Sequence, residues 1–133
     1  MNENKTDRYF TALKNLKQAL TNLKRSVETP IKEPRDLSGI VKDFEITYEL
    51  SWKLLKKFLE REGHEVKSAR EAYAKAYQLG YLKDESVWLK IIDDRNLTVH
   101  TYDQKFAEQM CSRIQQGYVQ AFGLLVGELD KRL

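Results

Sequence analysis

Residues 44–59, FEITYELSWKLLKKFL, carry the pattern that decides the fold. Large apolar side chains recur there at steps of three and four residues, at Phe44, Tyr48, Trp52, Leu55 and Leu59. This spacing places them on one face of an α-helix, because the helix completes a turn about every 3.6 residues. Ile46 and Leu50 widen the apolar face. We therefore expect this helix to contact more than one neighbouring element.

Helical spacing continues on both sides of this central stretch. Before it, a stripe of about six turns is formed by Phe10, Leu13, Leu16, Leu20, Leu23 and Val27. After it, a last helix of about seven turns is marked by Phe106, Met110, Ile114, Tyr118, Phe122, Leu125 and Leu129. Two shorter helices are expected in between, through residues 72–79 and 87–92.

Each later helix is preceded by a polar side chain that can cap it. Such a side chain accepts a hydrogen bond from the free N–H groups at the helix start. These side chains are Asp36 or Ser38 for the second helix, Ser68 with Glu71 for the third, Asp84 for the fourth, and Thr101 with Gln104 for the last. Gly63 and Gly80 are expected to end the second and the third helix.

These patterns predict an all-α protein in which residues 1–133 form a single domain. We expect an antiparallel four-helix up-and-down bundle with an additional short helix, because the two short helices can share the fourth position. The alternation of apolar and polar residues that is typical of strands is not found. The second helix has more apolar surface than one small bundle can hide, which predicts a homodimer.

The composition excludes several classes of protein. A net charge of +3, from 23 Lys and Arg against 20 Asp and Glu, is too small to indicate nucleic-acid binding by itself. No apolar run approaches the roughly 18–20 residues of a membrane span, and the N-terminus has no apolar signal segment. One cysteine, Cys111, and two distant histidines, His64 and His100, cannot form a disulfide or a zinc site. We expect a cytoplasmic protein without membrane contact, metal or cofactor.

One segment, DDRNLTVHTYD at residues 93–103, concentrates chemically active side chains. Arg95 and His100 are five residues apart, which on an unbroken helix is about 140° of rotation. Three β-branched residues between positions 98 and 101 disfavour a helix there. If the helix ends near Leu97, Arg95 and His100 can converge beside the start of the last helix, where free N–H groups favour a phosphate.

A neutral imidazole and a guanidinium at one phosphate suit RNA cleavage without a metal ion. His100, kept neutral by the nearby helix dipole, would take the proton of a ribose 2′-OH. Arg95 would stabilise the negative charge that develops on the phosphate. The alternative is a structural role, in which Arg95 pairs with Asp93 or Asp94 and His100 forms a hydrogen bond in a loop.

Two stretches of the chain resemble signature sequences of one family. Arg95, His100 and Tyr102 are spaced as in the motif of HEPN-domain ribonuclease toxins of the HepT type. FEITYELSWK at 44–53 and DRNLTVHTY at 94–102 resemble the nucleotidyltransferase substrate-binding protein family, which belongs to the HEPN superfamily. The resemblance covers nearly the whole chain.

The resemblance implies a HEPN-like helical homodimer that binds a minimal nucleotidyltransferase. Carried over to the matching positions, Arg95 and His100 would cleave RNA across the dimer cleft. The nucleotidyltransferase would act as antitoxin by adding AMP to Tyr102. An older interpretation of the same family makes its members the non-catalytic, substrate-binding subunit of a two-component nucleotidyltransferase.

Three further residues are expected to support the site around Arg95. Asp94 and Asn96 flank Arg95 in the sequence. Glu49 lies four residues after Glu45 on the same helix face, so these two carboxylates could orient Arg95 or simply be solvated. The Gly-Ser and paired-Asp signature of a nucleotidyltransferase active site is missing. The chain therefore cannot supply nucleotidyl transfer by itself.

Overall fold

The computed structural model describes residues 5–100 and 103–133, and every regular element in these ranges is helical. In chain order the elements are α1 (Lys5–Glu28), α2 (Pro34–Arg61), α3 (Ala69–Gln78), α4 (Glu85–His100), α5 (Gln104–Arg113), a π-helical turn η1 (Ile114–Tyr118) and α6 (Val119–Arg132). The all-α class that the sequence predicts is confirmed for these residues. Within the same ranges, every helix is too short or too polar to cross a membrane.

Helix α2 begins earlier than the sequence pattern suggests. Its N-cap is Glu33, and Pro34 stands at the first position, where the fixed φ of proline is already helical and its missing N–H costs nothing. The Asp36 carboxylate lies within the first turn and accepts hydrogen bonds from the backbone N–H groups of Lys32 (2.8 Å) and Glu33 (3.1 Å). The N-cap is therefore Glu33 and not Asp36 or Ser38, although Asp36 completes the capping box from the third helical position.

The caps predicted for α3 and α4 are confirmed. Ser68 Oγ accepts a hydrogen bond from the backbone N–H of Glu71 (3.1 Å). A carboxylate oxygen of Asp84 accepts hydrogen bonds from the backbone N–H groups of Ser86 (3.1 Å) and Val87 (3.3 Å). Both helices therefore start where a local side chain satisfies their free N–H groups.

The two predicted glycine stops are also confirmed. Gly63 follows α2 with φ +91°, and Gly80 follows α3 with φ +84°. Residues with a Cβ rarely adopt this left-handed conformation, which lets the chain close the last helical turn. After Gly63, the backbone N–H of His64 donates to the carbonyl of Leu59 (2.9 Å).

The last helical segment is not the continuous α-helix that the sequence predicts. It begins at Gln104, and its N-cap is Asp103, whose carboxylate accepts a hydrogen bond from the N–H of Phe106 (2.8 Å). The sequence predicts Thr101 as the cap, and that residue lies outside the described residues. In η1 the N–H of Val119 donates to the carbonyl of Ile114, five residues earlier. Because a π-helical turn holds an extra residue, it changes the register of α6 relative to α5.

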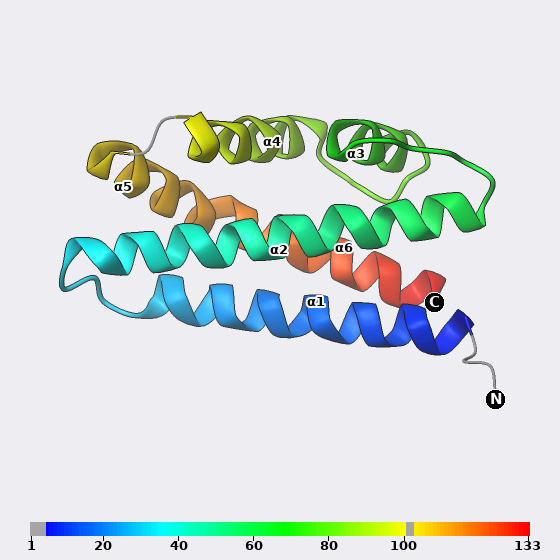
Figure 1. Cartoon of the computed structure of the whole chain (residues 1–133), viewed down its shortest axis with the longest axis horizontal. Helices are drawn as coiled ribbons and strands as arrows, with labels where there is room; N and C mark the ends of the chain where they lie inside the picture. The colour runs from blue at the N-terminus through cyan, green and yellow to red at the C-terminus, as the bar shows by residue number, and fades with distance from the viewer. Residues whose placement is uncertain (1–4, 101–102) are drawn as a thin grey trace.

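The long helices lie side by side, with α2 at the centre (Figure 1). Helices α1 and α2 form an antiparallel hairpin, α1 also contacts α6, and α2 also contacts α3 and α5. In Figure 1, α1 lies on one side of α2, and α3 and α4 lie on the other. The central position accounts for Leu50, which packs against the core, whereas Ile46 is 42% exposed.

Aromatic side chains connect most of the helices within the core. Five rings form a closed circuit of contacts in the order Phe44, Tyr48, Tyr73, Trp88 and Phe122, with neighbouring centroids 4.8–6.3 Å apart. They come from α2, α3, α4 and α6, so the circuit packs four helices together. Tilted, stacked and edge-to-face pairs of this kind stabilise a core beyond the burial of their area.

Replacing Phe44 with Ala should lower the free energy of unfolding by about 3–5 kcal/mol, because it removes a fully buried ring and leaves a cavity between helices. Urea unfolding followed by circular dichroism measures the change. Phe10→Ala is the matched control, since that ring is 56% exposed and its loss should cost no more than about 0.5 kcal/mol. Equal losses in the two variants would contradict the described core.

Candidate functional site

Helix α4 carries Asp94 and Arg95 and continues without a break to His100. The β-branched Thr98 is accommodated because its Oγ1 donates a hydrogen bond to the carbonyl of Arg95 (2.7 Å), close to the helix end. The expected end of this helix near Leu97, on which the convergence of Arg95 and His100 within one chain depends, is therefore wrong.

The predicted residues of the motif differ in how far the structure describes them. The side chain of His100 and the whole of Tyr102 lie outside the described residues. Positions 95 and 100 are about 140° apart around the axis of a continuous helix, so they do not share one face of α4. Asn96, predicted as a supporting residue, is exposed on α4.

Asp94 is buried, with 1% of its side chain exposed. Its carboxylate accepts two hydrogen bonds from the Arg113 guanidinium, from Nε at 2.7 Å and from Nη2 at 2.9 Å, and a third from the hydroxyl of Tyr118. A bidentate, charge-assisted pair of this kind offsets the cost of burying a carboxylate. The three residues join α4 to α5 and η1.

This pairing overturns the interpretation in which Arg95 is held by Asp93 or Asp94. Asp94 binds Arg113 instead, and the carboxylate of Asp93 lies 4.0 Å from Nη2 of Arg70. A role for Arg95 as the partner of Asp93 or Asp94 is thereby excluded, and the carboxylates that it contacts come from α2.

Arg113 and Tyr118 are residues of this region that the sequence analysis misses. They lie 19 and 24 residues after Asp94, beyond the reach of any local pattern. Burial raises the pKa of Tyr118 well above its ordinary value, and the hydrogen bond to Asp94 raises it further. The same carboxylate raises the pKa of Arg113. Tyr118 is therefore a neutral donor and Arg113 a permanent cation.

The Arg95 side chain lies against α2, with 20% of it exposed. Its Nη1 is 3.6 Å from a carboxylate oxygen of Glu45, and its Nη2 is 3.5 Å from one of Glu49. The guanidinium carbon lies 5.8 Å from the centroid of the Tyr48 ring, and Nη1 donates a long hydrogen bond to Thr98 Oγ1 (3.4 Å). The buried Nε has no hydrogen-bond partner among the described residues. Arg95 is therefore oriented, and the exposed part of its guanidinium, not the buried Nε, is what a ligand could reach.

The neighbours of Arg95 are themselves held in place. Glu49 accepts a hydrogen bond from the indole Nε1 of Trp52 (3.0 Å) and lies 3.8 Å from Nζ of Lys53. Burial, together with the nearby Glu49 carboxylate, raises the pKa of Tyr48 to about 12, so its phenol stays neutral at neutral pH. We call Arg95, Glu45, Glu49 and Tyr48 the Arg95 cluster.

The chemistry open to the Arg95 cluster follows from these groups. An oriented guanidinium can bind two oxygens of a phosphate through its planar fork. The two carboxylates of the cluster exceed its one cation, and Lys53, 3.8 Å from Glu49, offsets part of that negative charge. Within the described ranges, no group of three or more His, Cys, Asp or Glu side chains is arranged to hold a metal ion.

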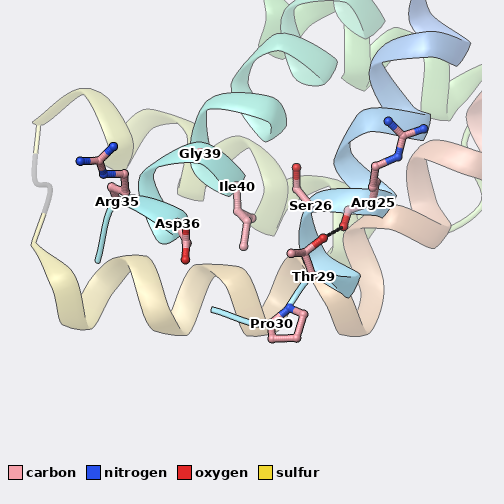
Figure 2. Close-up of a pocket in the computed structure, with 8 residues that line it drawn as sticks. All are labelled: Arg25, Ser26, Thr29, Pro30, Arg35, Asp36, Gly39 and Ile40. Atoms are coloured by element: carbon pink, nitrogen blue, oxygen red, sulfur yellow. Dashed lines mark hydrogen bonds between the residues drawn. The ribbon is translucent and has the colours of Figure 1, made fainter. Parts of the chain in front are cut away.

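A separate pocket of about 310 Å³ lies at the connection between α1 and α2 (Figure 2). Arg25 and Arg35 both line it, but Figure 2 shows their guanidinium groups on opposite sides, and Arg35 Nε pairs with Glu33 at 3.0 Å. The Thr29 hydroxyl is bound to the backbone carbonyl of Arg25 (2.8 Å). Because these polar groups do not converge, the pocket is a weaker candidate than the Arg95 cluster.

Arg113→Ala should lower the free energy of unfolding by about 3 kcal/mol, because it removes the cation that compensates for the buried Asp94 carboxylate. Arg70→Ala is the control: that side chain is 65% exposed and 4.0 Å from Asp93, so its loss should cost less than about 1 kcal/mol. Urea unfolding measures both. A loss for Arg113→Ala no larger than for the control would show that the buried pair does not stabilise the fold.

The chain is similar in sequence and in fold to several known proteins. The probable ribonuclease HepT of Haemophilus influenzae is 30% identical over 94 residues, which cover 67% of this chain and 64% of that protein, less than two thirds of its length. The fold is similar to the crystal structure of a Thermus thermophilus protein, with a TM-score of 0.76 and 32% identity, covering 86% of this chain and 98% of that chain.

A second similar structure comes from Haemophilus influenzae and is described as the fold of a substrate binding domain of a nucleotidyltransferase. Its TM-score is 0.67 at 25% identity, covering 93% of this chain and 98% of that chain. A family model described as nucleotidyltransferase substrate binding protein like matches residues 11–131. That match includes both stretches whose resemblance the sequence indicates. The chain therefore belongs to the nucleotidyltransferase substrate-binding protein family.

Proposed function

We propose that this protein is a metal-independent endoribonuclease of the HepT type, in which Arg95 and His100 act on one phosphodiester. The observation that carries the proposal is the Arg95 guanidinium, which is 20% exposed and oriented by the carboxylates of Glu45 and Glu49 at 3.6 and 3.5 Å. The similarity to a protein named probable ribonuclease HepT supports the same activity.

In the proposed reaction, His100 takes the proton of a ribose 2′-OH, and the 2′ oxygen attacks the adjacent phosphorus. The bond from phosphorus to the 5′ oxygen breaks, that oxygen takes up a proton from water, and His100 returns the proton that it accepted to the solvent. The products are a 2′,3′-cyclic phosphate and a 5′-hydroxyl end. Arg95 binds the phosphate oxygens and stabilises the charge that increases in the transition state.

The two groups act together when two chains contribute to one site. Because α4 is continuous, a homodimer would bring Arg95 of one protomer to the neutral imidazole of the partner's His100. Leu97 and Val99, 44% and 63% exposed at the same end of α4, support such an interface. Within each protomer, α3 and α4 would jointly fill the fourth position of a four-helix up-and-down bundle.

The partner that we propose is a minimal nucleotidyltransferase, since the family description names that enzyme. It would silence the toxin by adding AMP to Tyr102. This residue is two positions from His100, so the added phosphate and base would exclude an RNA phosphate from the cleft by charge and by size.

A second candidate function is that of a non-catalytic substrate-binding subunit of a two-component nucleotidyltransferase. The excess of carboxylates in the Arg95 cluster favours it, as does the description of the similar Haemophilus influenzae structure. This function predicts a stable complex with the nucleotidyltransferase and intact RNA.

The proposal is tested by incubating the purified protein with RNA in EDTA. The wild-type protein should cleave RNA, and Arg95→Ala should lower the rate about 10²–10³-fold, because the group that stabilises the phosphate charge is lost. His100→Ala should lower it about 10²–10⁴-fold through loss of the base.

Arg35→Ala is the matched control, since that side chain is 84% exposed and lies in the first turn of α2, ten residues before Glu45. It should cleave RNA as fast as the wild type, and circular dichroism should show that all variants remain folded. Cleavage that stops in EDTA, or equal rates for wild type and Arg95→Ala, would refute the ribonuclease proposal. Intact RNA together with a stable nucleotidyltransferase complex would support the second function.

A further inference from the structure

A pocket of about 430 Å³ lies between α3 and α4. Its walls carry the aromatic rings of Tyr73, Tyr77 and Trp88. Tyr73 and Trp88 are buried and stack on each other with centroids 4.8 Å apart, whereas Tyr77 is 40% exposed. Concave sites of about 300–1,000 Å³ with apolar and aromatic walls and a few polar groups are typical of small-ligand binding.

Polar side chains stand at the two ends of this pocket. Arg70, in the first turn of α3, is 65% exposed and 4.0 Å from Asp93. Gln78 ends α3 and Glu85 begins α4, and both line the pocket. Eight residues separate Arg70 from Gln78, a rise of about 12 Å along the helix. The cation therefore lies at one end of the pocket and the carboxylate of Glu85 at the other.

The α3–α4 pocket adjoins the Arg95 cluster. The ring of Tyr73 lies 5.4 Å from that of Tyr48, and the Tyr73 hydroxyl donates to the backbone carbonyl of Tyr48 (3.2 Å). The Tyr48 ring faces the guanidinium of Arg95. Asp93, beside Arg70, precedes Arg95 by two residues on α4. The positive end of the pocket is thus the end nearer to Arg95.

We infer that the α3–α4 pocket binds an unpaired base of the RNA strand, beside the nucleotide whose phosphate lies at Arg95. This inference rests on the proposed ribonuclease function. The exposed ring of Tyr77 offers a stacking surface, and every base has a π-face that can use it. Arg70 is placed to bind a phosphate of the same strand.

Glu85 gives the pocket a preference among the bases. Its carboxylate accepts hydrogen bonds from the exocyclic amines of adenine, cytosine or guanine. Uracil has no such amine, and its N–H lies between two carbonyl oxygens that repel a carboxylate. The pocket should therefore prefer an amine-bearing base to uracil.

The test uses short fluorescein-labelled 2′-O-methyl oligoadenylate and oligouridylate, which lack the 2′-OH needed for cleavage. Fluorescence anisotropy should show oligoadenylate binding at least about fivefold more tightly than oligouridylate. Tyr77→Ala should weaken oligoadenylate binding at least about fivefold through lost stacking, and Glu85→Gln should remove the preference between the bases. Phe10→Ala is the matched control, an exposed ring on α1 whose loss should leave binding unchanged.

Unchanged oligoadenylate binding by Tyr77→Ala would overturn the inference, and an unchanged base preference in Glu85→Gln would overturn the role of the carboxylate. Free AMP that binds as tightly as the oligomer would assign the pocket to a mononucleotide instead of a strand. Conversion of a dimer to a monomer by Tyr77→Ala, measured by light scattering, would assign this surface to contact between copies.

Failure of the inference and failure of the proposed function give different results. If oligoadenylate binding depends on Tyr77 while unmodified RNA stays intact, the pocket stands and the ribonuclease proposal fails. If Arg95 is required for cleavage while Tyr77→Ala binds oligoadenylate as the wild type does, the ribonuclease proposal stands and the pocket assignment fails.

Discussion

A buried carboxylate fixes the geometry of the candidate site. Asp94 is 1% exposed; the Arg113 guanidinium compensates its charge and the Tyr118 hydroxyl donates a further hydrogen bond, both from the segment that follows α4 in the chain. An uncompensated carboxylate in the interior is costly, so α4 cannot rotate or slide against α5 and η1 without losing these hydrogen bonds. The fixed rotation of α4 in turn directs Arg95 toward the two carboxylates of α2.

The same helix connects the candidate site with the core and with the α3–α4 pocket. Trp88 of α4 stacks on Tyr73 of α3, and Tyr73 is bonded to the backbone of Tyr48, whose ring faces Arg95. Packing in the aromatic core therefore also determines the shape of the pocket and the position of the guanidinium. The proposed ribonuclease site, base pocket and dimer interface would all use different faces or turns of α4.

Local patterns predict most of the fold and fail where contacts between distant helices decide the outcome. Apolar spacing predicts the central helix, and the caps of α3 and α4 are local signals that the structure confirms. The end of α4 is misjudged because β-branched residues disfavour a helix only weakly and Thr98 finds a backbone acceptor one turn back. For the site, helix spacing predicts that Glu45 and Glu49 share one face of α2, and the structure places carboxylate oxygens of both within 3.6 Å of the Arg95 guanidinium. The pairing of Asp94 with Arg113 depends on the register set by η1, which no local pattern reveals.

The central claim is that Arg95 stabilises an RNA phosphate while the 2′ oxygen of the adjacent ribose attacks it. The most direct measurement compares an RNA with its 2′-O-methyl counterpart in EDTA and identifies the product ends by mass spectrometry. The account predicts that the RNA is cleaved to 2′,3′-cyclic phosphate and 5′-hydroxyl ends, while the methylated strand stays intact. Cleavage of both strands, or products that end in a 5′-phosphate, would contradict it.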